Sequence, residues 1–410
     1  MKNLFGRIGP GMMLAAVAVG VSHLVQSTRA GADYGLSFAW LIVLIVVLKY
    51  PAFRFAVDYA SATGRSLVTG YSNISKFALV WLGVAFFVDM FIASGAVSLV
   101  TAGLFISVFN LPFSGPVVAV AIMVVSAAIL LNGHYARAER IVKLFVLAFS
   151  LLAVTATLFA VPLLGSEGRD LFAQITPSRS LAIFVIAVAG WMPMPMTGSI
   201  FQSMWVCERR RSGDTEFDYQ RSLSDLRIGY SLALVLAICF LVMGTAVLFQ
   251  TDRVVPANAG AFATELLSIF TTVIGDWSYP IIAAAAIAVM WSTQIALLDA
   301  LPRVSDRLFG IMTGREAGQP GRYTRFLILQ VVGVSIILLF LMSGFGTFIN
   351  FATSTGFLAG PAIAYYNYRA VTLPEVGVEF RPDKKLIIWN WLSIVSLTLF
   401  AIVYIYLRVT

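Results

Sequence analysis

Polar residues and helix breakers gather at two places in an otherwise apolar sequence. Residues 20–28 read GVSHLVQST, and residues 190–198 read GWMPMPMTG. The prolines of the second stretch, Pro193 and Pro195, each remove a helical hydrogen bond and clash with the preceding turn, so we expect an unwound segment there. Unwound backbone carries free amide and carbonyl groups that can bind an ion or a polar solute. The alternative is that Gly and Pro only kink two packed helices.

The side chains of these stretches supply few kinds of ligand. The candidate binding residues are Gly20, Ser22, His23, Trp191, Met194 and Met196. Imidazole, thioether and carbonyl groups form an uncharged set, which suits a soft monovalent cation better than a hard dication. If a metal binds, His23 and Met194 are the expected ligands. Trp191 and the methionines could instead line a pocket for a small organic solute, an anion or an organic amine, and the sequence leaves these alternatives open.

Two titratable side chains lie deep in apolar segments. His23 changes its charge near neutral pH and could serve proton coupling; the alternative is a neutral histidine bonded to a backbone carbonyl. Asp89 is expected to relay protons, and the alternative is a hydrogen bond to a neighbouring helix or a place near the cytoplasmic mouth. Asn350 and Thr353 could face the same vestibule, although hydrogen bonding between helices is the default for such residues.

The elements that position these residues are expected to be transmembrane helices. Hydrophobic residues make up 59% of the 410 positions, charged residues 12%, and the mean hydropathy is +0.89. Soluble domains do not expose that much apolar surface, and only lipid-embedded helices suit apolar runs of about 20 residues. Eleven such runs lie near 9–29, 34–53, 78–109, 114–132, 141–163, 181–205, 228–250, 278–300, 325–343, 346–367 and 386–407. The amphipathic segment 260–275 is expected to be an external surface helix or a lead into the eighth span.

The two polar stretches lie five spans apart, and an odd spacing inverts the second unit relative to the first. We therefore predict one transmembrane domain, 1–410, that is all α-helical. It contains a first five-helix repeat at 8–163, an inverted repeat at 181–368 and an additional eleventh helix at 385–408. Helices 1 and 6 are expected to be interrupted near the middle of the membrane.

The distribution of Lys and Arg predicts the orientation of the chain. With the N-terminus in the cytoplasm and the C-terminus outside, the cations left on the outer side are Arg29, Arg169, Arg179, Arg253 and Arg408. The remaining Lys and Arg residues, Lys49 among them, are placed in the cytoplasm. The net charge of +8 then follows from retention of cations inside and from contact with anionic lipid, so no nucleic-acid partner is implied. We expect a multi-pass protein of the cell inner membrane.

Several functional classes lack support in the sequence. Cys207 and Cys239 suggest neither a disulfide framework nor a thiolate metal cluster, and the N-terminus reads as the first span rather than a cleavable signal. Phosphate loops and paired histidine ligands are missing, so we expect neither an enzyme nor a cofactor. The expected partners are a small-molecule or ion substrate and membrane lipid, with no obligatory protein partner.

Short motifs resemble those of the Nramp family of proton-coupled divalent-metal transporters. They are Gly9-Pro10, Ala30-Gly31-Ala32 with Gly35, Ala62-Thr63-Gly64-Arg65-Ser66-Leu67, Asp89 with Gly95-Ala96, and Met194-Pro195. The likeness covers residues 8–250. Beyond residue 250 it consists mainly of a shared topology. It implies the LeuT-type fold and symport of a metal ion with protons, with Arg325 as a match for an arginine of the proton route.

The departures from the family pattern fall at the site. The family's Asp-Pro-Gly-Asn becomes Gly20-Val21-Ser22-His23, its Met-Pro-His becomes Met194-Pro195-Met196, and its small residue before that motif becomes Trp191. Ile92 stands where the second acid of helix 3 is expected. We therefore expect an Nramp-related secondary transporter with a binding site free of carboxylates. The alternatives are the same scaffold carrying a small organic or anionic solute, and a transport-inactive membrane sensor.

Overall fold

The computed structural model describes residues 9–132, 135–165, 170–211, 218–251, 256, 258–315, 318–342 and 344–409. For 135–146 and 408–409 it describes the backbone alone. Some cations used to predict the orientation lie outside the described residues, either entirely or by their side chains: Lys2, Arg7, Arg137, Arg140, Lys143, Arg169, Arg253 and Arg408.

Helices occupy every apolar segment of the first half of the chain. Their bounds are α2 Pro10–Ala18, η1 Val21–Ser27, α3 Thr28–Tyr34, η2 Leu36–Phe38, α4 Ala39–Thr63, α5 Leu67–Ile74, α6 Lys76–Phe109, α7 Gly115–Leu131 and α8 Tyr135–Leu164. The short α5 was not expected from the sequence; it packs against α6 and, from the second half, α16.

The second half repeats this pattern. Its elements are α9 Arg179–Trp191, α10 Gly198–Arg211, α11 Tyr219–Leu248, α12 Ala259–Ile274, η3 Asp276–Ser278, α13 Tyr279–Thr313, α14 Arg322–Ile336, η4 Ile337–Leu341, α15 Phe345–Leu358, α16 Gly360–Val371, η5 Val378–Phe380 and α17 Lys384–Val409. The segment expected at 260–275 is a separate helix, α12, and it packs against α6, α8 and α13. The helix of the eighth span, expected near 278–300, continues to Thr313.

Both predicted interruptions are present. In the first span α2 ends at Ala18, and the chain resumes at Val21 as η1, which has π-helical hydrogen bonding. In the sixth span α9 ends at Trp191, and α10 begins at Gly198. The Ser22 Oγ lies 3.1 Å from the carbonyl oxygen of Pro193, so the two breaks face each other.

The tenth span is also interrupted, which the sequence analysis did not foresee. α15 ends at Leu358, and α16 begins at Gly360. Pro361 has no amide hydrogen for the carbonyl of Phe357, which explains a break at this point. Eight helical stretches within the described residues are long and apolar enough to cross a membrane, and the divided sixth and tenth spans are not among them.

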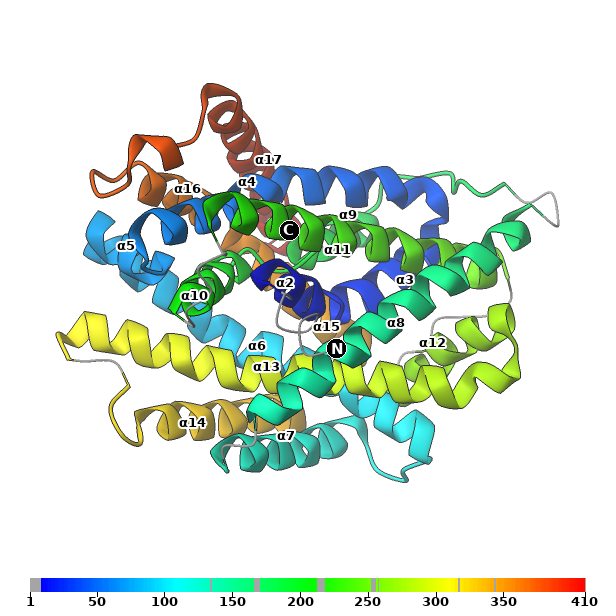
Figure 1. Cartoon of the computed structure of the whole chain (residues 1–410). Helices are drawn as coiled ribbons and strands as arrows, with labels where there is room; N and C mark the ends of the chain where they lie inside the picture. Colours follow the sequence, from blue (N-terminus) through cyan, green and yellow to red (C-terminus); the bar gives the residue numbers. More distant parts are fainter. Residues whose placement is uncertain are drawn as a thin grey trace.

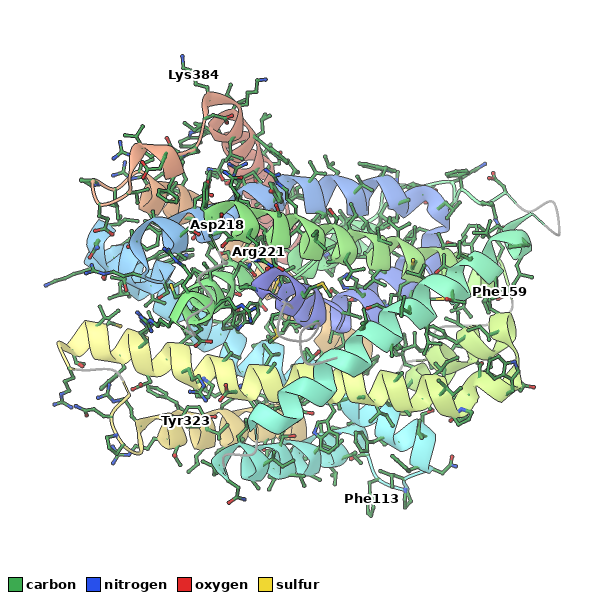
Figure 2. The ribbon with its side chains drawn as sticks, in the orientation of Figure 1. Phe113, Phe159, Asp218, Arg221, Tyr323 and Lys384 are labelled. Carbon is green, nitrogen blue, oxygen red and sulfur yellow. The ribbon has the colours of Figure 1, made fainter. Side chains whose placement is uncertain are left out.

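The broken first span lies in the middle of the bundle, beside α11 (Figure 1). Glycines allow the two backbones to approach closely. A Cβ atom on Gly229 of α11 would lie 1.8 Å from the carbonyl oxygen of Gly11, and one on Gly31 would lie 2.1 Å from that of Leu241. Small residues at such crossings are typical of membrane helices. The outer surface is apolar: Phe113, labelled in Figure 2, and Phe159 on α8 are each 60% exposed.

We predict that Gly229→Ala lowers the stability of the protein. The added methyl group would collide with the backbone of α2, and overpacking of this kind costs about 1–3 kcal/mol. The measurement is the melting temperature in detergent. Gly83→Ala is the matched control, because a Cβ atom there meets nothing within 4 Å. Equal melting of the two variants would show that α2 and α11 are not in backbone contact.

Candidate functional site

A cavity of about 40 Å³ lies where the two breaks meet. A water molecule needs roughly 10–15 Å³ on this measure, so the cavity has room for a small ion or a few waters. Four of the predicted binding residues line it: Gly20, Ser22, Trp191 and Met194. Its other polar side chains are Asp89, Thr197 and Thr293.

Asp89 supplies a carboxylate to this cavity. It lies on α6, is 7% exposed, and accepts a hydrogen bond of 2.5 Å from the Thr197 hydroxyl just before α10. The expectation of a site free of carboxylates is therefore wrong. Motif comparison along the first span could not detect this group, because α6 is a different helix that passes beside both breaks. Of the described residues that line the cavity, Asp89 is the one that can carry a full charge.

His23 lies behind the cavity rather than in its wall. The imidazole is fully buried, and its Nε2 lies 2.8 Å from the carbonyl oxygen of Ala233 on α11. A carbonyl only accepts, so Nε2 carries a hydrogen. The Nδ1 atom lies 2.8 Å from the Ser22 hydroxyl. The alternative of a histidine bonded to a carbonyl is therefore what the structure shows, and His23 does not line the cavity with Met194.

The methionines of the second break have different environments. Met194 lines the cavity and lies over the first residue of α10, since a Cβ atom on Gly198 would be 2.3 Å from the Met194 methyl carbon. Met196 is buried away from the cavity, where it packs near Gly360 of α16. Only one of the two predicted thioethers is thus available to a bound cation.

Asn350 and Thr353 belong to a polar network outside the cavity lining. Gln26 Nε2 donates to Thr353 Oγ1 at 3.1 Å, and Arg29 Nη1 donates to Asn350 Oδ1 at 3.0 Å. The Arg29 guanidinium also lies 5.1 Å from the centre of the Phe184 ring on α9. These contacts tie the second half of the first span to α15 and α9. In this conformation Asn350 and Thr353 form hydrogen bonds between helices, which is the default that the sequence analysis gave for them.

Arg325 is not brought close to the cavity. It is exposed on the first turn of α14, whereas Arg322 three residues earlier is buried and has its Nη1 atom 3.1 Å from Asp306 Oδ1. Of the predicted proton route His23, Asp89 and Arg325, Asp89 alone lines the cavity. The route as a whole stays a prediction.

Lys49 is a buried cation that the sequence analysis misplaced. It lies near the middle of α4, is 1% exposed, and donates to the carbonyls of Gly190 at 2.8 Å and Met194 at 3.3 Å. Counting it as a cytoplasmic residue was wrong, because α4 continues ten residues beyond the expected end of the second span at 53, to Thr63. The signal was present in the apolar residues Ala52, Phe53, Phe55, Ala56 and Val57 that follow it.

Two buried amides adjoin the cavity wall. Gln294 follows Thr293 on α13, and Gln202 follows Phe201 on α10. Both side chains are at most 1% exposed and have no hydrogen-bond partner in the described part of the chain. Buried amides are normally bonded to protein, water or an ion. Gln202 was not singled out in the sequence, although glutamine inside an apolar helix was a usable signal.

We predict that His23→Ala destabilises the protein. The substitution removes the hydrogen bond from Nε2 to the buried Ala233 carbonyl, which is worth about 0.5–1.5 kcal/mol, and takes the imidazole out of its packed site. The melting temperature in detergent measures this loss. Asn132→Ala is the control, because that amide is exposed at the end of α7 and, among the described residues, bonds to Ala128 O. If His23→Ala melts as the control does, the two hydrogen bonds of the imidazole are not formed.

The comparisons with known structures agree with this architecture. The sequence matches no protein-family model. A mutant manganese transporter of Eremococcus coleocola superposes with a TM-score of 0.71 at 15% identity over 98% of this chain and 86% of that one. MhsT in complex with L-phenylalanine gives 0.62 at 13% identity over 95% and 98%. Mhp1, a nucleobase-cation-symport-1 family transporter, gives 0.53 at 13% identity over 98% and 92%.

These likenesses show the LeuT-type fold, with two inverted five-helix repeats and an eleventh helix. The protein is therefore a multi-pass membrane protein. The sequence is also 31% identical over 402 residues to the "Uncharacterized protein PM0681" of Pasteurella multocida, covering 96% of this chain and 89% of that protein. The chain thus belongs to the same family as that Pasteurella protein and is built on the LeuT-type transporter fold.

Proposed function

We propose that the chain is a secondary active transporter that carries a small cation through the cavity between its two broken helices. The observation that supports this most directly is the Asp89 carboxylate in the cavity wall, beside backbone freed by the breaks. A carboxylate compensates part of the hydration that a cation loses on entering a protein. Half-helix ends with unwound carbonyls are the ion sites of transporters built from inverted repeats.

The size of the cavity also favours an ion. About 40 Å³ does not accommodate an organic solute stacked on Trp191, and the negative charge of Asp89 disfavours an anion. Met194 adds a polarizable sulfur that binds soft metal ions. We therefore keep a metal or other small cation as the substrate, in line with the resemblance to Nramp transporters.

The contacts at the two ends of the first span suggest how access alternates. At one end, Gly11 N of α2 donates to Asp225 Oδ2 of α11 at 2.5 Å. At the other end, Arg29 is bonded to Asn350 of α15. We propose that transport breaks one of these contacts at a time, so that the cavity opens to one side while it stays closed to the other. In this proposal the protein lies in the cell inner membrane with its C-terminus outside. The end of the first span near Asp225 then faces the cytoplasm.

The driving ion of this transport is a separate question. The resemblance implies symport with protons, and this stays a prediction. In this conformation Asp89 lines the cavity, whereas His23 and Arg325 do not. We therefore expect a proton path to use other groups or water between them.

We predict that Asp89→Asn lowers cation uptake at least about tenfold, because the neutral amide no longer compensates the charge of the bound ion; a loss of this size corresponds to about 1.4 kcal/mol. The measurement is uptake of Na⁺, Mn²⁺ and Cd²⁺ into proteoliposomes that carry an ion gradient. Asp276→Asn is the matched control, since that carboxylate is exposed in η3.

The two possible failures of this test differ. If the wild-type protein accumulates none of the three ions, the proposed function is wrong and a sensor or a transporter of another solute takes its place. If uptake occurs but Asp89→Asn transports as well as Asp276→Asn, the cation does not bind at Asp89.

A further inference from the structure

The ammonium group of Lys49 occupies backbone acceptors that the second break sets free. In an unbroken helix the carbonyl of Gly190 would accept from the amide of Met194, but α9 ends at Trp191. Lys49 Nζ takes that place, with bonds of 2.8 Å to Gly190 O and 3.3 Å to Met194 O. The last carbonyls of a helix carry partial negative charge, so a cation is stabilised there.

No carboxylate of the described residues lies within ion-pair distance of Lys49. The nearest acid on its own helix along the chain, Asp58, lies two turns or more away and has Arg54 at 3.6 Å. From α11, which packs against α4, Tyr230 donates its hydroxyl hydrogen to Val46 O. The positive charge is thus compensated by helix carbonyls rather than by a neutralising side chain.

This charge is one residue removed from the cavity, through Met194. The side chain of Met194 lines the cavity, and the carbonyl of the same residue holds the ammonium. Asp89 is the acid in the wall. A bound cation therefore meets one negative group in the wall and one positive group behind it, in a region with little water to screen either charge.

Repulsion from a fixed positive charge doubles when the charge of the bound ion doubles, and so a dication is penalised more than a monovalent ion of the same size. The cost of removing hydration also rises steeply with ionic charge. One carboxylate offset by one ammonium leaves too little negative charge to repay that cost. A monovalent cation needs only the compensation that Asp89 supplies.

We propose that Lys49 is a specificity-determining residue, which makes the site select a monovalent cation over a divalent cation of equal size. This inference rests on the proposed function and names the substrate class of the same cavity. The resemblance implies a divalent metal as the substrate; the inference replaces it with a singly charged ion.

The test uses Na⁺ and Cd²⁺, which have nearly the same ionic radius and differ in charge. Uptake of each ion, and competition between them, is measured in proteoliposomes that contain the full chain. In the wild type, Na⁺ is expected to be transported in preference to Cd²⁺. Lys49→Met and Lys49→Gln remove the charge and should shift the selectivity ratio toward Cd²⁺ by at least about tenfold, the effect of one neighbouring unit charge.

Two controls, Lys49→Arg and Lys76→Met, accompany the two neutral variants. Lys49→Arg keeps the charge and should keep the wild-type preference. Lys49→Gln keeps a donor for the freed carbonyls, so it covers the case in which Lys49→Met does not fold. Lys76→Met removes a lysine that is exposed at the start of α6 and should leave the ratio unchanged.

Two results would overturn the inference while leaving cation transport intact. One is a wild-type protein that prefers Cd²⁺ to Na⁺. The other is an unchanged ratio in the neutral Lys49 variants. A wild type that takes up neither ion nor Mn²⁺ removes the proposed function itself, and the inference with it.

Discussion

Every peptide group inside a bilayer has to find a hydrogen-bond partner within the protein, and this constraint governs the centre of the molecule. The breaks at residues 19–20 and 192–197 interrupt the helical hydrogen bonds at the point where the two spans meet. Side chains from other helices satisfy part of what is left. The Ser22 hydroxyl lies 3.1 Å from the carbonyl oxygen of Pro193, and Lys49 donates to the carbonyls of Gly190 and Met194. A small cavity lies where the two breaks meet.

The same constraint determines the charge of the site. Lys49 is buried because free carbonyls at the end of α9 can solvate an ammonium group, and Asp89 is buried because Thr197 donates a hydrogen bond to it. Each group has a separate structural partner, so neither neutralises the other by direct contact. In the transport proposed here, a bound ion is exposed to both fields, and its charge affects how strongly it binds.

Asn367 ties the tenth span to the sixth span and to the helices beside them. Asn367 of α16 donates to Ala52 O of α4 and to Ser199 Oγ of α10, and it accepts from the Tyr71 hydroxyl of α5. The break before α16 lies at Gly360, which adjoins Met196. Three interrupted spans thus contact one another near the sixth. Such helices can change their relative tilt without breaking long runs of hydrogen bonds, which suits a transporter that opens to alternate sides.

The sequence by itself determined the helices and the places where two of them stop. Apolar run length reveals a membrane span, and Pro193, Pro195 and the polar run after Gly20 reveal the breaks, because these effects are local to the chain. The break at Ala359 was missed, although Pro361 was a local signal.

Only the tertiary structure decided which side chains meet. Depth in the membrane follows from position along a helix, but the direction of a side chain follows from how that helix is rotated and packed against residues far away in sequence. Asp89 turns into the cavity, whereas His23 turns away from it toward α11. Lys49 reaches a carbonyl 141 positions away. No spacing within a single span contains that information, because interhelical contacts fix it.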